Sequence, residues 1–314
     1  MEDILLVLNE WWREKTVRED LAKPYKRKFF KEIIENIGYR QIQVLTGLRR
    51  VGKSTLLFQT IQYLISKGVN PKNILYFSFD IEKTDLLNLL KTYSIITKTN
   101  WKREKTFLIL DEIQKLPSWP SKLKVIYDNF PNVKILVSGS ASLLLEKEAS
   151  ANLAGRYFTH KITPLTIIEH YELKTGKKIE DPEIWKPELE SHLKEYLETP
   201  FPEIIGWSPF KTREYIRELI IEKVIRSDIP STTKVNPEKI EILLNILYGE
   251  PGQQLNLDPL SRDLKASKKT LVKYLWHLKY SYLTREVMNY KPSIKSISTL
   301  LHGCAYNCGL SSTN

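Results

Sequence analysis

The stretch Gly47-Leu-Arg-Arg-Val-Gly-Lys-Ser54 decides the fold of this chain. Two glycines five positions apart are followed by a lysine and a hydroxyl residue, which is the pattern of a phosphate-binding loop. Residues 41–46 before it read as a short buried strand, and residues 55–65 after it have helical apolar spacing. Because the pattern requires strand, loop and helix in this order, we predict a polyphosphate site here.

The residue types of this loop divide the binding task among them. Backbone N–H groups of the loop and of the following helix would surround the phosphates. Lys53 would reach the β- and γ-phosphates and assist catalysis, and the Ser54 hydroxyl would bind Mg²⁺. For the side chains of Arg49 and Arg50, contact with phosphate and a role at the sheet edge both stay open. The predicted nucleotide-binding residues of this stretch are Gly47, Arg50, Val51, Gly52, Lys53, Ser54 and Thr55.

Adjacent acids at the end of a later strand-like run supply the second half of the site. Residues 106–112 contain four apolar residues followed by Asp111-Glu112, which come after Ser54 in the order that a nucleotide-hydrolysing site requires. Asp111 is predicted to hold the Mg²⁺ shell. Glu112 is predicted to orient and deprotonate the attacking water.

Three further polar residues are candidates for sensing the terminal phosphate. Ser138 and Ser140 follow the run 133–137, and either hydroxyl could bond the γ-phosphate or the attacking water. The alternative is a serine that caps a helix over 141–145. Arg156 is predicted to stabilise charge on the transferring phosphate, in its own subunit or in a neighbour's, and a surface ion pair is the ordinary alternative.

The segments around these residues predict an α/β fold. Strand-like runs at 73–80, 106–112, 133–140 and 157–165 alternate with helical or turn segments. Near-continuous apolar strands of this kind indicate a parallel sheet covered on both faces. Ligands of such sheets bind at the carboxyl ends of the strands.

Composition limits the partners and the compartment. The chain has 314 residues, a net charge of +11 and only two cysteines, Cys304 and Cys308, so we expect no disulfide scaffold and a cytoplasmic location. No apolar run is long enough to span a membrane. The guanine-reading Asn-Lys-x-Asp motif is absent, because the nearest stretch, residues 97–100, lacks the acid. We therefore expect ATP and Mg²⁺ as ligands.

The C-terminal third has a different character. Residues 166–235 are predicted to form a helical lid or connector, in which Tyr215, Ile216, Leu219, Ile220 and Val224 form one apolar helical face. A further helix is predicted over 237–247.

A helix-turn-helix is predicted next, with helices at 257–266 and 268–278 and Ser267 as the cap of the second helix. We expect Leu271, Val272, Leu275 and Leu278 to face inward and Thr270, Lys273, Tyr274 and His277 to face outward. A strand over 283–290 would form a wing. Lys268, Lys269, Thr270 and Lys273 are candidate contacts to double-stranded DNA, and a protein-docking role is the alternative.

Several motifs together resemble a prokaryotic family of AAA-type ATPases with an uncharacterised C-terminal domain that contains a winged helix. The resemblance covers roughly residues 5–292 and is carried by the loop at 47–54 and by the stretches 111–119, 138–142, 153–156, 164–165 and 271–275. It implies ATP hydrolysis on a sheet ordered 5-1-4-3-2, a helical connector and a winged helix. It also favours a nucleotide-sensing role for Arg156.

The predicted organisation is therefore an ATPase domain at 1–165, a connector at 166–235, a winged helix at 236–292 and an irregular tail at 293–314. Family members continue past the wing into a region that resembles restriction endonucleases, which we expect to be absent here. Thr199-Pro200 also stands where relatives carry glycines. The leading hypothesis is an Mg²⁺-dependent ATPase, with a homo-oligomer as one possible state, that moves the C-terminal module on DNA. The alternative is an ATP-switched DNA-binding regulator.

Overall fold

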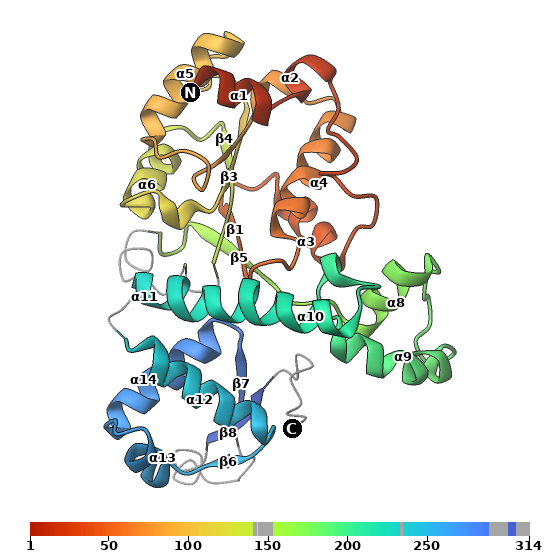
Figure 1. Cartoon of the computed structure of the whole chain (residues 1–314). Helices are drawn as coiled ribbons and strands as arrows, with labels where there is room; N and C mark the ends of the chain where they lie inside the picture. Colours follow the sequence, from red (N-terminus) through yellow and green to blue (C-terminus); the bar gives the residue numbers. More distant parts are fainter. Residues whose placement is uncertain (141–142, 144–152, 233–234, 289–300, 306–314) are drawn as a thin grey trace. The chain divides into compact units, whose positions relative to one another are not determined.

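A computed structural model of the chain describes residues 1–140, 143, 153–232, 235–288 and 301–305. The chain forms two compact units (Figure 1). The first comprises Met1–Gly47 and Gly52–Thr163, and the second comprises Leu48–Val51 and Pro164–Asn314. The first unit thus ends two residues before the predicted boundary at 165. The finer division at 235 and 292 stays a prediction.

The first unit is built on a five-stranded parallel sheet. Its strands are β1 (Ile42–Gly47), β2 (Ile74–Ser78), β3 (Thr106–Asp111), β4 (Val133–Gly139) and β5 (Tyr157–Ile162). Their order is β2-β3-β4-β1-β5, which reads 5-1-4-3-2 from the opposite edge. Every residue of β1, β2 and β3 is buried, as expected for parallel strands covered on both faces.

Helices cover both faces of this sheet. On one face lie α3 (Lys28–Asn36) and α4 (Lys53–Ser66), and on the other lie α5 (Leu86–Thr97) and α6 (Trp119–Asn129) (Figure 1). Helix α4 begins directly after the glycine-bounded loop, so its N-terminus and the loop share one edge of the sheet. That edge carries the carboxyl ends of the parallel strands, where ligands of such sheets bind.

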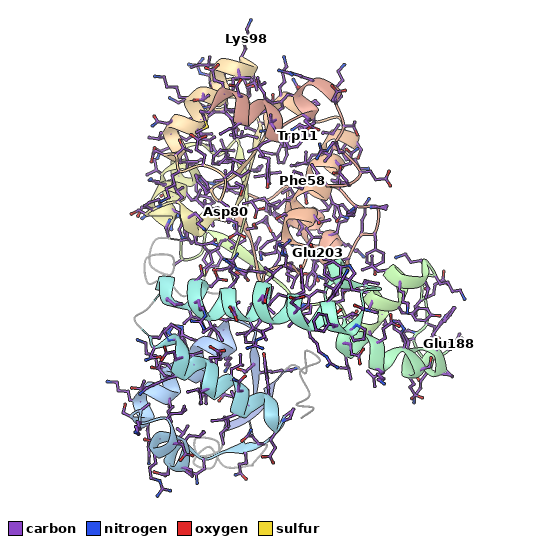
Figure 2. The ribbon with its side chains drawn as sticks, in the orientation of Figure 1. Trp11, Phe58, Asp80, Lys98, Glu188 and Glu203 are labelled. Carbon is purple, nitrogen blue, oxygen red and sulfur yellow. The ribbon has the colours of Figure 1, made fainter. Side chains whose placement is uncertain are left out.

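The N-terminal residues cover the edge strand β2, which α1 (Glu2–Leu8) and α2 (Trp11–Glu14) approach. The Asn9 side chain donates to the Tyr76 carbonyl at 3.0 Å and accepts from the Tyr76 N–H at 2.7 Å, so one side chain replaces a missing strand partner. Trp11 packs edge-on against Phe58 and Tyr76, and Figure 2 shows Trp11 and Phe58 inside this unit. Edge-strand groups that are covered in this way cannot pair with another chain.

The second unit begins with helices. They are α8 (Ile167–Thr175), α9 (Lys186–Glu198), α10 (Pro209–Tyr215), two π-helical segments (Ile216–Ile221 and Val224–Asp228) and α11 (Ile229–Thr232), with a short 3-10 turn at Pro202–Ile204. The predicted inner face is wrong at Leu219, which is 38% exposed. The other four residues of that face are buried as predicted, and because π-helical winding lengthens the turn, Ile221 and Ile225 are buried as well.

The rest of the second unit combines three helices with a small antiparallel sheet. Its elements are α12 (Pro237–Gly249), β6 (Gln254–Leu255), α13 (Leu257–Asp263), α14 (Lys268–Tyr280), β7 (Thr284–Met288) and β8 (Leu301–Ala305), and the sheet order is β6-β8-β7. The predicted irregular tail is therefore wrong at residues 301–305, which pair with both other strands. Within the described part of the chain, no helix is both long and apolar enough to cross a membrane.

Candidate nucleotide site

Asp111 is the centre of a buried polar cluster at the carboxyl edge of the sheet. It ends β3, is 4% exposed and accepts four hydrogen bonds. One carboxylate oxygen accepts from Ser54 Oγ at 2.6 Å and from the Tyr76 hydroxyl at 3.3 Å. The other accepts from Ser138 Oγ and from the Glu112 N–H. The structure thus brings together Ser54, Asp111 and Ser138 from β3, β4 and the start of α4.

The loop before α4 has the backbone expected of a phosphate cradle. Gly52 has φ +90°, a left-handed conformation that side chains rarely adopt, and Arg50 also has a positive φ of 64°. Lys53 is buried, and its Nζ donates to the Gly47 carbonyl at 3.2 Å, which folds the side chain back across the loop. A triphosphate at this position would offer Lys53 anionic acceptors in place of the carbonyl.

Tyr76 is a member of the cluster that the sequence did not indicate. It lies in β2 among apolar residues, where a tyrosine resembles any other core side chain. Burial raises the pKa of the phenol, and the adjacent Asp111 carboxylate raises that pKa further. The phenol therefore stays a neutral donor that holds one oxygen of Asp111. The usable signal would have been the hydroxyl itself, because a buried tyrosine usually needs a hydrogen-bond partner.

Glu112 follows directly and takes an unusual backbone conformation, with φ 51° and ψ 44°. A non-glycine residue in this region costs on the order of 1–3 kcal/mol, and such residues cluster at functional sites. The conformation turns the chain into the 3-10 segment Ile113–Lys115, and Gln114 Nε2 then donates to Glu112 Oε2 at 2.6 Å. A carboxylate thus sits one residue beyond Asp111, as the predicted role for Glu112 requires.

Of the two serines left open, Ser138 joins the Asp111 cluster and is fully buried. Ser140 is half-buried, and its carbonyl accepts from the Leu143 N–H at 3.0 Å. The helix expected over 141–145 lies, apart from residue 143, outside the described residues. The geometry favours Ser138 as the sensing hydroxyl.

The loop arginines pair with acids of the second unit, to which residues 48–51 belong. Arg49 makes a two-pronged pair with Asp228, at 3.1 and 2.7 Å, and Arg50 pairs with Glu203 at 3.1 Å. The Arg50 guanidinium also lies 5.9 Å from the centre of the Tyr215 ring. These side chains therefore hold protein carboxylates, and the predicted contact of Arg50 with a nucleotide stays a prediction.

Arg156 is placed far from the loop of its own subunit. It precedes β5, and its carbonyl accepts from the N–H of Ile42, the first residue of β1. The loop follows the last residue of β1, so the two lie at opposite edges of the sheet, separated by a strand length of roughly 17 Å. The Arg156 side chain pairs with Asp128 at 3.0 Å. This position argues against a role in its own subunit's site and leaves the role in a neighbour's site open.

The oxygen ligands at the edge of the sheet fit a magnesium ion. Mg²⁺ prefers oxygen donors and is usually held through one or two carboxylates together with substrate phosphates. Ser54 and Asp111 supply a hydroxyl and a carboxylate already within 2.6 Å of each other. Among the described residues, no group of three or more His, Cys, Asp or Glu side chains could hold a metal by itself. A metal here would therefore depend on the phosphates of a bound nucleotide.

Comparison with known proteins agrees with this geometry. Residues 39–171 match a family model described as an AAA domain, a range that contains the loop, Asp111, Ser138 and all five strands. The matched range thus holds the whole five-stranded parallel sheet. A second model, described as a domain of unknown function, matches residues 192–300 and does not overlap the first match.

The matches to two relatives cover more of this chain than residues 39–171. An uncharacterized protein of Methanocaldococcus jannaschii is 30% identical over 298 residues, which cover 85% of this chain and 60% of the relative. One of Haemophilus influenzae is 27% identical over 274 residues, which cover 84% and 66%. The chain thus spans about three fifths to two thirds of the length of these curated relatives. Among solved structures, Cdc6p of Pyrobaculum aerophilum matches 94% of this chain and 96% of its own at 12% identity, but the TM-score of 0.38 establishes no shared fold.

The candidate DNA-contacting residues lie at the start of α14. Ser267 caps the helix as expected, accepting from the Thr270 N–H at 3.2 Å. Lys269 and Lys273 are exposed, Thr270 is half-buried, and Lys268 pairs with Asp258 at 2.6 Å.

The predicted faces of α14 are partly wrong. Tyr274 and His277 are buried, whereas Val272 is 48% exposed. Tyr274 turns inward because its hydroxyl accepts from the Asn236 N–H at 3.4 Å. The spacing of apolar residues along the helix does not predict this contact. The exposed side of the helix consequently presents Val272 and Trp276 beside the lysines.

Proposed function

We propose that this chain binds Mg²⁺-ATP at the loop Gly47–Ser54 and hydrolyses it to ADP and phosphate. The observation that carries the proposal is the 2.6 Å hydrogen bond between Ser54 and Asp111, because it joins the two residues that would bind the metal. Bound Mg²⁺ would neutralise charge on the β- and γ-phosphates. ATP is preferred over GTP because the sequence lacks the guanine-reading motif.

The residues divide the reaction as follows. Glu112 takes a proton from water as the water oxygen attacks the γ-phosphorus. The bond between that phosphorus and the bridging oxygen breaks, and the bridging oxygen leaves with ADP. Lys53 and the loop N–H groups stabilise the charge that develops on the transferring group. Ser138 touches Asp111 and so reports on the occupancy of the site.

The test compares wild type with Glu112→Gln. The variant keeps the shape and the hydrogen-bonding capacity of residue 112 but loses the base. We expect phosphate release to fall by about 100-fold or more, the low end of what a general base contributes. ATP affinity measured by calorimetry should stay within a few-fold. Equal rates of phosphate release would remove Glu112 from this role, and an absence of ATP binding would refute the proposal as a whole.

Arg156 is proposed to complete the site of a neighbouring copy in a homo-oligomer. Its place at the opposite edge of the sheet from the loop supports the neighbour alternative. Mixing Arg156→Ala subunits with Glu112→Gln subunits tests it, because each variant alone should be inactive. In the mixture, a site with an intact Glu112 can receive Arg156 from the other subunit, so activity should reappear. No recovery would count against the neighbour role.

We further propose that residues 236–305 form a winged helix which hydrolysis moves, with double-stranded DNA as its partner. The order helix, short strand, two helices and two strands supports this reading. The cap on α14 and the exposed lysines at its start support DNA contact.

The second candidate function is an ATP-switched DNA-binding regulator with little turnover. It is favoured by the exposed lysines of α14, which need no hydrolysis to bind phosphates. Changing Lys269 and Lys273 to Glu should abolish retardation of duplex DNA, whereas Lys239→Glu, a change outside α14, is the control. If the α14 variants retard duplex DNA as strongly as wild type, both DNA proposals are excluded. If ATP changes the retardation by Glu112→Gln as strongly as the retardation by wild type, the ATP-switched regulator is favoured.

A further inference from the structure

Gln114 makes a short contact to the proposed base. Its Nε2 donates to Glu112 Oε2 at 2.6 Å. We propose that Gln114 is a positioning residue, which holds the Glu112 carboxylate in one orientation for attack by water. This inference rests on the proposed hydrolysis and names a residue that acts on it through Glu112.

The backbone is folded to bring this amide back to the carboxylate. The left-handed conformation of Glu112 reverses the chain, and the Lys115 N–H donates to the Glu112 carbonyl at 2.9 Å to close the turn. Ile113 is fully buried and anchors the turn in the core. Side chains two residues apart do not face each other in a helix, so the contact depends on this turn.

The strand beside the turn leaves room for the amide. A Cβ at Gly139, the last residue of β4, would stand 2.5 Å from Gln114 Oε1, closer than any real contact. Gly139 has an ordinary φ, so a side chain there would be opposed by its neighbours, Gln114 Oε1 and Leu143 Cδ2 at 3.0 Å, and not by its backbone. The Gln114 amide is thus enclosed between the Glu112 carboxylate and the end of β4.

The orientation of the amide shows which contact dominates. Gln114 Oε1 is buried without a hydrogen-bond partner, which costs about 1–3 kcal/mol. Rotating the amide by half a turn would place Oε1 against the carboxylate and leave that carboxylate without this donor. The donor to Glu112 therefore outweighs an unsatisfied acceptor.

The experiment measures phosphate release over a range of ATP concentrations together with ATP affinity, for wild type, Gln114→Ala, Gln114→Glu and Gly139→Ala. Gln114→Ala should lower kcat by about 10-fold, which is a part of what a general base contributes. Its KM for ATP should stay within roughly three-fold of the wild-type value, because Gln114 does not contact the nucleotide in this proposal. Gly139→Ala should do the same, because its new methyl group displaces the amide. Lys115→Ala is the control: it lies in the same turn, its side chain pairs with Asp80 on the surface, and its profile should match wild type.

Gln114→Glu supplies the reading that a purely structural role would not produce. A carboxylate of the same size fills the space but cannot donate a hydrogen bond to Glu112, so kcat should fall at least as far as in Gln114→Ala while ATP affinity is kept. An unchanged kcat in Gln114→Ala would overturn the positioning role. Loss of ATP affinity in step with kcat would overturn it as well, by showing a structural effect. If Glu112→Gln releases phosphate as fast as wild type, the proposed role of Glu112 in hydrolysis is wrong. If Glu112→Gln is slow but the Gln114 variants match wild type, the proposed hydrolysis stands and only the role of Gln114 is wrong.

Discussion

Each unit buries a cluster of hydrogen-bonded polar side chains, and the two clusters are built differently. In the first unit, the Asp111 carboxylate accepts from Ser54, Ser138, Tyr76 and the Glu112 N–H. All donors converge on one acceptor. In the second unit, His170 is fully buried between α8 and α9 and makes one contact on each side of its ring.

The second cluster has a fixed order of donors and acceptors. The Thr199 hydroxyl donates its only proton to the Glu195 carbonyl at 2.8 Å, so it must accept from His170 Nε2. His170 Nδ1 is then without a proton and accepts from His192 Nε2 at 2.7 Å. Each group in this series of hydrogen bonds donates to the next. The hydrogen-bonding capacity of His170 is thereby used up.

The difference separates a site from a structural network. Donors that converge on a carboxylate can turn to a phosphate or give way to a metal, because each loses only one partner. A head-to-tail chain loses its order when any member changes. Position agrees with this distinction: Asp111 lies at the carboxyl edge of a parallel sheet, where ligands bind, and His170 lies between two packed helices.

The largest expected effect follows from replacing Asp111 with Asn. The amide keeps the size of the side chain but removes the charge that would hold Mg²⁺. We expect phosphate release to fall by about 100-fold or more, since loss of a single electrostatic contact at a reacting centre has effects of this order. The measurement is Mg²⁺-dependent phosphate release. Asp80→Asn is the matched control, because Asp80 lies just beyond β2 and is exposed (Figure 2). A rate for Asp111→Asn near that of the control would place the metal elsewhere.

Acid should weaken the second cluster in a defined pH window. Burial, then the neighbouring His192, lowers the pKa of His170 from 6.5 to about 4, with Lys174 lowering it and Glu195 raising it. The unfolded chain therefore binds a proton that the folded chain excludes, so stability is complete above pH 6.5 and declines as the pH falls toward 4. The full loss is about 3 kcal/mol. Urea unfolding at pH 7 and pH 4.5 measures it.

Other groups titrate in the same range, so the comparison needs a reference variant. Burial also lowers the pKa of His160, His192 and His277. His170→Phe removes the titration of His170 and keeps the other three histidines. The difference in stability between wild type and this variant therefore isolates the contribution of His170. An equal slope of stability against pH in both proteins would contradict the assignment.

At neutral pH, His170→Phe should itself destabilise the protein by about 2 kcal/mol. The ring volume is kept, but the N–H of His192 Nε2 loses its acceptor in a buried position, and an unpaired donor costs on the order of 1–3 kcal/mol. The urea midpoint at pH 7 reports the change. His277→Phe is the control: His277 is 4% exposed and makes no side-chain hydrogen bond within the described residues, so its loss should cost less. Equal costs would show that packing, not the ordered chain, stabilises this region.

The sequence predicts the first cluster well because chain order determines it. Once the loop follows β1 and the acids end β3, the parallel sheet brings Ser54 and Asp111 to one edge without further information. Tyr76 and Gln114 were not found in the same way. A tyrosine in a buried strand looks like core, and the reach of Gln114 depends on the left-handed backbone of Glu112, which no residue type announces.

The second unit was harder to predict because its contacts depart from simple periodicity. π-Helical winding moves Leu219 outward, and a hydroxyl turns Tyr274 inward. The histidine chain joins His170 and His192, which lie 22 residues apart on different helices. Nothing in the spacing of two histidines indicates that their rings will meet.

The smallest expected effect concerns the loop arginines Arg49 and Arg50, whose ion pairs lie within the second unit. Arg49 and Asp228 form a two-pronged pair, in which the side chains are 30% and 11% exposed. In the second pair, Arg50 is 48% exposed and Glu203, which is labelled in Figure 2, is 44% exposed. Alanine double-mutant cycles should give a coupling of about 1 kcal/mol for the first pair and under about 0.5 kcal/mol for the second, because water screens exposed pairs.

The measurement is urea unfolding of the full chain in the absence of nucleotide. Arg49→Lys should keep the charge but lose most of the coupling, since an ammonium group cannot donate from two fixed nitrogens. The outcome separates geometry from charge in these pairs. If Arg49 and Asp228 couple and the exposed pair does not, one geometry-dependent contact holds residues 48–51 within the second unit. If both pairs couple equally, charge alone holds these residues, and raising the salt concentration should then weaken both pairs to the same extent.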